Sequence, residues 1–332
     1  MREFFRRLVH SLEGGQPAVL VSIVTSGGST PRGAGAMMAV YPGGSSDGTV
    51  GGGAGEYEAQ LEAARLLAAK KNGLRSFRFT PGSASGAGMV CGGDVTMHFH
   101  YLDPGDGRNA DVFRELLLAD GQGADAWFVR KLDGAAVTAM GVATRAGTRL
   151  CGEQAPASAL QPGAAFADGW FAVQTVRAGK VWIFGAGHVS RALVPVLASV
   201  GFRPTVCDDR AEFASPALFP QAEAVLCVGF AKLPETVRIT PDDYVVVMTR
   251  GHQADYEVLA QTLRSGAKYL GCIGSAKKLA LCRDRLLDAG FTAGEYAALH
   301  APIGLAIGAQ TPEEIAVAVA AELIAVRSGA LK

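Results

Sequence analysis

The sequence predicts an α/β protein of two domains, a mixed α/β domain in residues 1–176 and a Rossmann-like domain with a doubly wound parallel sheet in residues 177–332. The length is the first observation, because 332 residues allow about two domains at ~150 residues each. Only the second half alternates short apolar runs with helical or polar segments, which is the pattern of parallel βαβ units. A glycine-rich turn directly follows the first of those runs.

The elements of the first domain follow from changes in hydrophobic pattern. The N-terminal MREFFRRLVHSLEGG predicts an amphipathic helix. AVLVSIVT and AMMAVY predict strands around a loop too rich in Gly and Pro to continue either. A glycine-rich loop then leads into a helix, whose apolar stripe is expected to contain Tyr57, Leu61, Ala64 and Ala68. Residues 95–101 alternate like a half-buried strand, and residues 105–175 predict one helix and two or three strands.

The second domain is predicted as alternating strands and helices. Its apolar runs, in chain order, are VWIF, PTVC, AVLCV, YVVVM and KYLGCI. The helix after VWIF extends through Leu197. Thr311, Pro312 and Glu314 have the spacing of a capping box with proline at the first helical position, so they predict the start of the last helix.

Composition and charge exclude several function classes. Lys+Arg and Asp+Glu both number 31, for a formal net charge of zero, whereas general binding to nucleic acid or anionic membrane needs clustered basic charge. No apolar stretch is long enough to span a membrane. The six cysteines include no C-x-x-C pair, so we expect neither a zinc site nor a disulfide framework but thiols in a reducing cytoplasm. A homodimer is the default expectation for the assembly.

The turn after VWIF is a dinucleotide-binding fingerprint in its required context. Gly185, Gly187, His188 and Ser190 lie between a strand and a helix, and the next strand ends in Asp208. The first glycine allows a tight turn, the second lets backbone approach a pyrophosphate, and the helix N-terminus supplies N–H donors. Asp208 would accept hydrogen bonds from ribose hydroxyls. The fold itself can also hold another phosphate-bearing ligand.

Two further loops follow strands of the second domain, at the edge where such sheets bind ligands. Arg250 and His252 could bind phosphate there, with Asp255 orienting the imidazole. The same residues also fit an ordinary helix start with Asp255 in its first turn. Ser275 could touch a phosphate, or it could simply cap a helix.

The first domain contains weaker candidates. Glu56 follows a run of glycines at a helix start, where it either caps the helix or binds donors of a neutral heterocycle. Cys91 precedes a Gly-Gly pair, which leaves its thiol approachable, although most single cysteines are inert core residues. His98 and His100 share one strand face without a third ligand, so we expect a solvated or interface face and no metal site.

Taken together, these segments resemble the XdhC/CoxI family of accessory factors for molybdenum hydroxylases such as xanthine dehydrogenase. In the first domain the resemblance rests on GGSTPRGAGAMMAV, GTVGGGAGEYEAQ and GMVCGGDV. In the second it rests on VWIFGAGHVSRAL, VCDDR, VVVMTRGHQADYEVL, IGSAKKL and APIGLAIGAQTPEEIAVAVAAEL. The ordered set is specific, although each piece alone is weak.

The resemblance implies a non-enzymatic maturation factor in the cytoplasm. Such a protein would bind molybdenum cofactor (molybdopterin), protect its sulfurated form and help insert it into a xanthine-dehydrogenase-like apo-enzyme, with a cysteine desulfurase as sulfur donor. Cys91 matches the family's Cys-Gly-Gly and becomes the candidate for contacting the molybdenum or its sulfur, because a thiolate is a soft ligand. Arg32 matches the family's first loop, and Glu56 matches the glutamate after its glycine run.

Two departures from the family pattern and two alternatives bear on this interpretation. Ala54 stands where the CoxI-like branch tends to have Cys, so the XdhC-like branch fits better, and Ala306 replaces a usual acidic residue. The runner-up is an NAD(P)-dependent oxidoreductase on the same Rossmann domain, but no acid/base pair for hydride transfer is evident. A pure scaffold with a vestigial Rossmann domain is the third reading. Whether the second domain holds NAD(P), a nucleotide form of the cofactor or nothing stays open.

Overall fold

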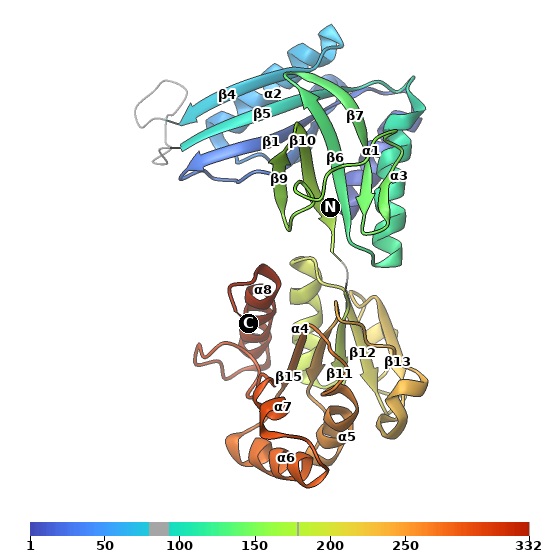
Figure 1. The fold of residues 1–332 in the computed structure, drawn as a ribbon, viewed down its shortest axis with the longest axis vertical. Coiled ribbons are helices and arrows are strands. Elements are labelled where there is room, and N and C mark those ends of the chain that lie inside the picture. Colours follow the sequence, from blue (N-terminus) through green and yellow to red (C-terminus); the bar gives the residue numbers. More distant parts are fainter. Residues whose placement is uncertain (80–92, 178, 332) are drawn as a thin grey trace. The chain divides into compact units, whose positions relative to one another are not determined.

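The computed structural model describes residues 1–79, 93–177 and 179–331. The chain divides into two compact units, Met1–Arg177 and Ala178–Lys332 (Figure 1). In the described ranges, no helix is both long and apolar enough to cross a membrane.

Within its described residues, the first unit contains two antiparallel five-stranded sheets and three long helices. The helices are α1 (Arg2–Glu13), α2 (Gly53–Ala69) and α3 (Gly107–Gln122). The first sheet has the order β3-β2-β1-β5-β4 and consists of β1 (Ala18–Gly28), β2 (Met37–Val40), β3 (Ser46–Gly48), β4 (Gly73–Phe79) and β5 (Gly93–Leu102). The second has the order β8-β7-β6-β10-β9 and consists of β6 (Ala126–Asp133), β7 (Ala136–Thr144), β8 (Gly147–Arg149), β9 (Ala164–Ala167) and β10 (Trp170–Val176).

A shared core joins the two sheets with α1 and α3. It contains Leu8 of α1, Leu20 of β1, Phe113 of α3 and Phe128 of β6, all with no exposed surface. The opposite face of the first sheet packs against α2. Residues 105–175 therefore contain one helix and five strands, two more than the upper limit of the prediction. The extra strands β8 and β9 are short edge strands of three and four residues, too short to show an alternating pattern.

Two details of the first unit correct the expectations. Of the two alternatives expected for His98 and His100, the solvated face is wrong, because they are 0% and 7% exposed on the side of β5 that faces the buried Arg130 of β6. The expected apolar stripe of α2 is also wrong, since Tyr57 and Leu61 are 62% and 54% exposed. The residues that α2 buries are Gly55, Ala59, Ala63 and Leu66, whose mostly small side chains let the helix lie close to the sheet.

The second unit confirms the predicted Rossmann-like fold. Its strands, in the order β13-β12-β11-β14-β15, are all parallel: β11 (Val181–Phe184), β12 (Pro204–Asp208), β13 (Ala224–Cys227), β14 (Tyr244–Val247) and β15 (Tyr269–Cys272). Its helices are α4 (His188–Ser199), α5 (His252–Thr262), α6 (Ala276–Asp288), α7 (Ala293–Ala297) and α8 (Pro312–Ser328). The strand order reverses at β11, which has β12 on one side and β14 on the other. Such a switch point is where open α/β sheets bind ligands.

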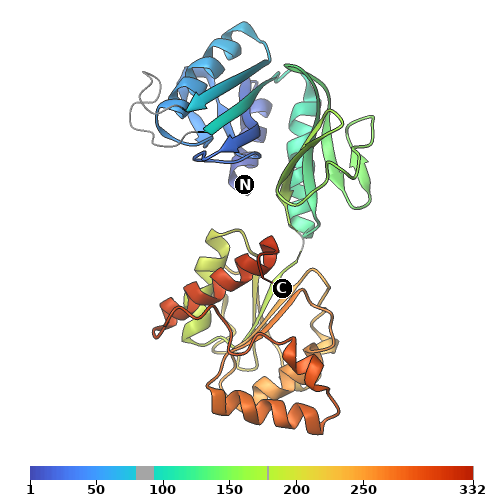
Figure 2. The ribbon, with the colours of Figure 1, turned by 60° about the vertical axis from the view of Figure 1, so that its left-hand side comes forward.

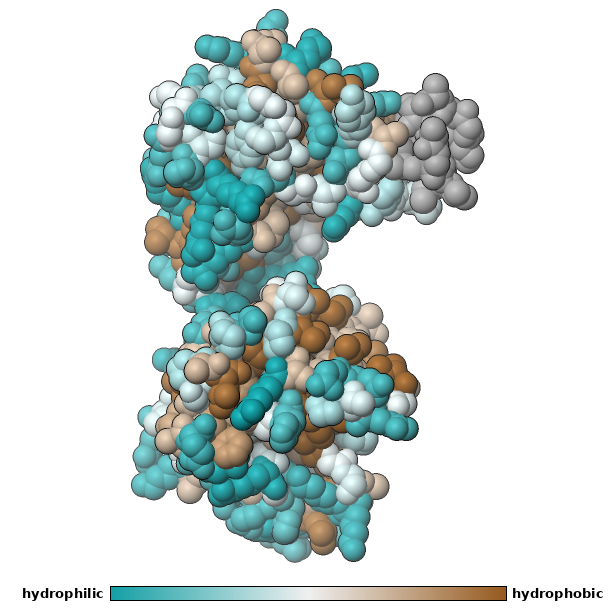
Figure 3. All heavy atoms as spheres, turned by 180° about the vertical axis from the view of Figure 1, so that it is seen from behind, coloured by the Kyte–Doolittle hydropathy of each residue, from teal (hydrophilic) through white to brown (hydrophobic). Residues whose placement is uncertain are grey.

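Helices cover both faces of this sheet (Figure 2). One core contains residues of α4 and α8, and the other contains residues of α5 and α6. The predicted capping box of α8 is confirmed, because Thr311 accepts the Glu314 N–H and Glu314 accepts the Thr311 N–H. Apolar side chains also reach the surface of this unit (Figure 3). Ile307 and Val317, for example, are 56% and 51% exposed.

Candidate functional site

The tight turn after β11 requires glycine at its first position. Gly185 has φ +107°, and a Cβ there would lie 2.3 Å from the carbonyl oxygen of Met248. Its N–H donates to the carbonyl of Cys207 at 2.7 Å. Ser190, in the place of the third glycine of the fingerprint, is buried and its hydroxyl donates to the Gly185 carbonyl. The serine therefore holds the turn in place from inside the unit.

Gly187 has a different role. It is the N-cap of α4 and has no side-chain cap. A Cβ at this position would have nothing within 4 Å, and its φ of −77° is open to any residue. Glycine here leaves the first N–H groups of α4 uncovered, as an anion site at a helix N-terminus requires.

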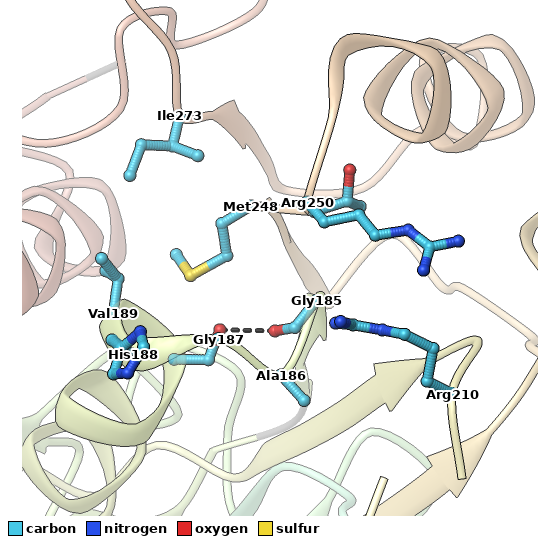
Figure 4. Close-up of a pocket in the computed structure, with 11 residues that line it drawn as sticks. Gly185, Ala186, Gly187, His188, Val189, Arg210, Met248, Arg250 and Ile273 are labelled. Atoms are coloured by element: carbon cyan, nitrogen blue, oxygen red, sulfur yellow. Dashed lines mark hydrogen bonds between the residues drawn. The ribbon is translucent and has the colours of Figure 1, made fainter. Parts of the chain in front are cut away.

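The turn opens into a cavity of about 260 Å³ at the switch point of the sheet. The glycine turn and His188 line one part of it, while Val189, Met248 and Ile273 provide an apolar side. Figure 4 shows the guanidinium of Arg210 pointing toward Gly185, with Arg250 on the same side and His188 on the opposite side. The cavity therefore combines backbone N–H groups, cationic side chains and an apolar surface, the features that bind a phosphate-bearing ring compound.

Asp208 lies at the end of β12 beneath the turn and is 1% exposed. Its Oδ2 accepts the Ala186 N–H at 2.8 Å and Arg210 Nη2 at 3.0 Å. Its Oδ1 accepts the Arg210 N–H at 3.0 Å and Arg210 Nε at 2.9 Å. Burial opposes ionisation, but these hydrogen bonds, from Arg210 and Ala186, outweigh it and lower the pKa of the carboxyl. The aspartate predicted to bind ribose is thus already occupied by protein donors.

The other predicted residues of this unit divide into two groups. Gly185, Gly187, His188 and Arg250 line the cavity together, whereas His252 and Ser275 do not. His252 is exposed at the start of α5. Ser275 is the N-cap of α6 and accepts the Lys278 N–H at 3.4 Å.

Asp255, the suggested partner of His252, has other partners. Its Oδ1 accepts the N–H and the hydroxyl of Thr249 at 3.0 and 2.5 Å. Its Oδ2 lies 2.5 Å from Lys278 Nζ. Asp255 therefore fixes the loop after β14 and ties α5 to α6.

In the first unit, Glu56 closes the glycine-rich loop before α2. Its Oε2 accepts the hydroxyl of Thr49 and the N–H groups of Val50, Gly51 and Gly52, the last three at 3.0, 3.3 and 3.1 Å. Burial opposes ionisation of this carboxyl, but the Thr49 and backbone hydrogen bonds outweigh it and lower its pKa. The carboxylate thus occupies the anion-binding concavity of its own loop, which makes it a cap.

The remaining candidates of the first unit are less constrained. Arg32 is exposed in the connection between β1 and β2. Cys91 lies outside the described residues. Within those residues, no group of three or more His, Cys, Asp or Glu side chains could hold a metal ion.

A second cavity, of about 670 Å³, lies at the end of the first sheet where β5 begins. Hydroxyl groups predominate among its side chains, which come from Thr25, Ser26, Ser76, Phe77, Asp94 and Thr96. Gly93 pairs with Gly28 beside it, and a Cβ at Gly93 would lie 2.6 Å from the carbonyl oxygen of Ser29. Glycine at this position therefore lets β5 approach the loop after β1.

Comparison with known proteins finds two family models, one matching in each unit. The family model described as "XdhC Rossmann domain" matches residues 181–323, and the model described as "XdhC and CoxI family" matches residues 11–78. The chain belongs to the XdhC/CoxI family. The first match contains the whole cavity at the glycine turn, and the second contains the loop closed by Glu56.

Three known proteins match nearly the whole chain. YqeB of Escherichia coli (strain K12) is 29% identical over 95% of this chain, which spans only 44% of the length of YqeB. The molybdenum cofactor insertion chaperone PaoD of the same organism is 24% identical over 98% of this chain and 88% of its own length. A crystal structure titled a xanthine dehydrogenase from Bacillus halodurans is 25% identical, with a TM-score of 0.79 over 99% of this chain and 97% of that one.

Among the charged residues that line the XdhC/CoxI Rossmann site, sequence reasoning missed Arg210. Arg210 lines the cavity and holds Asp208, and its guanidinium lies 3.7 Å from the centre of the Phe213 ring. The signal was present in the sequence, because Arg210 directly follows Asp208 and Asp209 at the end of the second strand. An arginine close to that acid can change what the site recognises.

Proposed function

We propose that this protein binds molybdenum cofactor, protects its sulfurated form and delivers it to a xanthine-dehydrogenase-type molybdenum hydroxylase. The observation that carries the proposal is the match to PaoD, a molybdenum cofactor insertion chaperone, over 98% of this chain. The match also covers 88% of the length of PaoD. The cofactor is the cargo of this reaction, and the client hydroxylase performs the catalysis.

The first unit would handle the molybdenum end of the cargo. Cys91 enters the proposal from the sequence, as the soft thiolate that contacts the molybdenum or its sulfur. The hydroxyl-lined cavity at the start of β5 supports this assignment, because it offers hydrogen-bonding groups in the same unit. Arg32 supplies an exposed cation in the adjoining loop. Glu56 acts indirectly, by holding the glycine-rich loop.

The second unit would hold a phosphate-bearing ligand, either the nucleotide form of the cargo or NAD(P). The support is the cavity in which the uncovered N-terminus of α4 is combined with Arg210 and Arg250. A cysteine desulfurase as sulfur donor, a homodimeric state and a cytoplasmic location complete the proposal. Copurification and the native mass of the protein test the first two.

The deciding experiment is metal and pterin analysis of protein purified from cells that make molybdenum cofactor, combined with activation of the client apo-enzyme. Cys91→Ser keeps the size of the side chain but removes the soft sulfur ligand. We expect cofactor retention and client activation to fall together by about tenfold or more, with little change in stability. Cys227→Ser is the matched control, because Cys227 is a free, exposed thiol at the end of β13.

Two results would contradict the proposal at different levels. A Cys91→Ser protein that carries molybdenum and activates its client like the wild type would remove Cys91 from the site. Wild-type protein that binds no pterin in these cells would overturn the chaperone function itself.

A further inference from the structure

The carboxylate of Asp208 has no acceptor capacity left for a ligand. A carboxylate offers about four lone-pair positions, and Asp208 receives four hydrogen bonds, from Ala186 N, Arg210 N, Arg210 Nε and Arg210 Nη2, at 2.8–3.0 Å. The side chain is also 1% exposed. A ribose hydroxyl could bind Asp208 only by displacing one of these donors.

This arrangement inverts the polarity of the ribose-binding position. Rossmann domains that bind NAD use the acid at the end of the second strand to accept the ribose 2′-hydroxyl. Here Arg210 lies between that acid and the cavity and lines the cavity itself. The position therefore presents donors of a guanidinium where NAD needs an acceptor.

The second arginine reinforces this polarity. Arg250 also lines the cavity, whereas neither Asp208 nor Asp209 does so. Asp209 is 3.1 Å from Arg250 Nη2, and the side chains of this pair are 26% and 58% exposed. An exposed ion pair of this kind is weak, so Arg250 can exchange Asp209 for a ligand anion. Among the described residues, Arg210 Nη1 has no hydrogen-bond partner.

We propose that the cavity selects an adenine nucleotide with a second phosphate on its ribose, the NADP class in preference to NAD. The 2′-phosphate contacts Arg210 and Arg250, and the 5′-phosphates bind the N-terminus of α4 at Gly187. The nucleoside packs on the apolar side formed by Val189 and Met248. The inference rests on the proposed binding of a phosphate-bearing ligand by the second unit, and it names the class of that ligand.

Calorimetric titration with 2′,5′-ADP and 5′-AMP tests the inference on the full chain, because the two probes differ only in the 2′-phosphate. We expect 2′,5′-ADP to bind about tenfold more tightly or better, because charge-assisted hydrogen bonds to guanidinium are strong. NADP⁺ and NAD⁺ should show the same order. The difference should shrink as salt concentration rises, because exposed charges are screened.

Variants distinguish a specific role of the two arginines from a general effect of positive charge near the cavity. Arg250→Gln should weaken the binding of 2′,5′-ADP more than that of 5′-AMP and so reduce the preference, and its exposed position makes unfolding no concern. Arg210→Ala should abolish the preference and strengthen NAD⁺ binding, because Asp208 regains acceptor positions. Arg191→Gln is the matched control, an exposed arginine on α4 that does not line the cavity.

The overturning results are distinct from failure of the chaperone proposal. Equal affinity for the two probes, or a preference that survives in both Arg210→Ala and Arg250→Gln, would show that the arginines do not read a 2′-phosphate. Absence of binding for all four nucleotides also overturns the inference. If such a protein still retains molybdenum cofactor, only the nucleotide assignment has failed.

Discussion

Arg210 and Asp208 form a bidentate ion pair, in which Nε donates to Oδ1 at 2.9 Å and Nη2 donates to Oδ2 at 3.0 Å. The two residues are two positions apart in the chain, and the pair lies at the end of β12. Asp208 Oδ2 also accepts the Ala186 N–H. One buried carboxylate therefore ties the cavity's arginine to the glycine turn.

Asp208→Asn should lower the free energy of unfolding of the second unit by about 2 kcal/mol, because it weakens charged hydrogen bonds and leaves a buried donor unpaired. Asp284→Asn, at an exposed pair on α6, should change stability little. Hydrogen exchange of β11 and β12 measures the effect within one unit. Since the pKa of Asp208 is lowered in the folded state, its contribution is complete above pH ~3.9 and is lost as pH falls through the folded-state pKa. Unchanged exchange in Asp208→Asn would contradict this prediction.

Gly187→Val should abolish ligand binding to the second unit with the fold retained. The added side chain has open space and enters the cavity, so it blocks the ligand without a clash. Gly185→Ala is the contrasting variant, because its methyl group would collide with the Met248 carbonyl at a positive φ. That variant should lose about 2 kcal/mol of stability. Titration with nucleotides and molybdopterin, together with thermal unfolding, separates the two effects. Gly187→Val protein with wild-type affinity for every ligand would show that the turn is only structural.

Glu56→Ala should loosen the glycine-rich loop before α2. The variant leaves the N–H groups of Val50, Gly51 and Gly52 without their common acceptor. The free energy of unfolding should fall by about 1–3 kcal/mol, as it does when a helix cap or a charged hydrogen bond is removed. Faster hydrogen exchange in residues 49–56 measures it, and Glu58→Ala in the same helix is the control. A loop that exchanges at the wild-type rate in Glu56→Ala would exclude the capping role.

The first unit should lose stability in mild acid because of His98 and His100. Burial and the nearby Arg130 lower the pKa of His98 to about 3 and hold that of His100 well below its usual value. In the unfolded chain both rings titrate near pH 6.5. Above pH ~6.5 both rings are neutral in the folded and in the unfolded chain, so they do not make the free energy of unfolding depend on pH there. Each contributes a stability loss of about 1.4 kcal/mol per pH unit as pH falls below that value.

Urea unfolding between neutral and mildly acidic pH, followed by exchange in β5 and β6, measures this slope. In Arg130→Met the His98 ring should protonate at a higher pH, because the neighbouring positive charge is gone. NMR of the imidazole carbons reports the proton directly. A His98 ring that is charged at pH ~6 in the wild type would contradict the prediction.

The sequence by itself determined the Rossmann-like sheet and the place of its glycine turn. Both signals are local, since a parallel strand buried on both faces reads as a continuous apolar run, and Gly185 follows such a run directly. The cap of α8 at Thr311 is local for the same reason. The buried face of α2 was predicted wrongly, because the helix packs the side with its alanine residues against the first sheet and not the side with the larger residues.

Only the tertiary structure decided what the polar residues of the two units contact. The carboxylate oxygens of Asp208 accept hydrogen bonds from a backbone N–H 22 residues away and from Arg210. A motif that predicts ribose binding therefore positions an arginine instead. His98 meets Arg130 from another sheet, 32 residues away, although its strand alternates as if half solvated. A hydrogen bond depends on atoms within about 3 Å, and distances in sequence do not specify which side chains the packing of sheets brings that close.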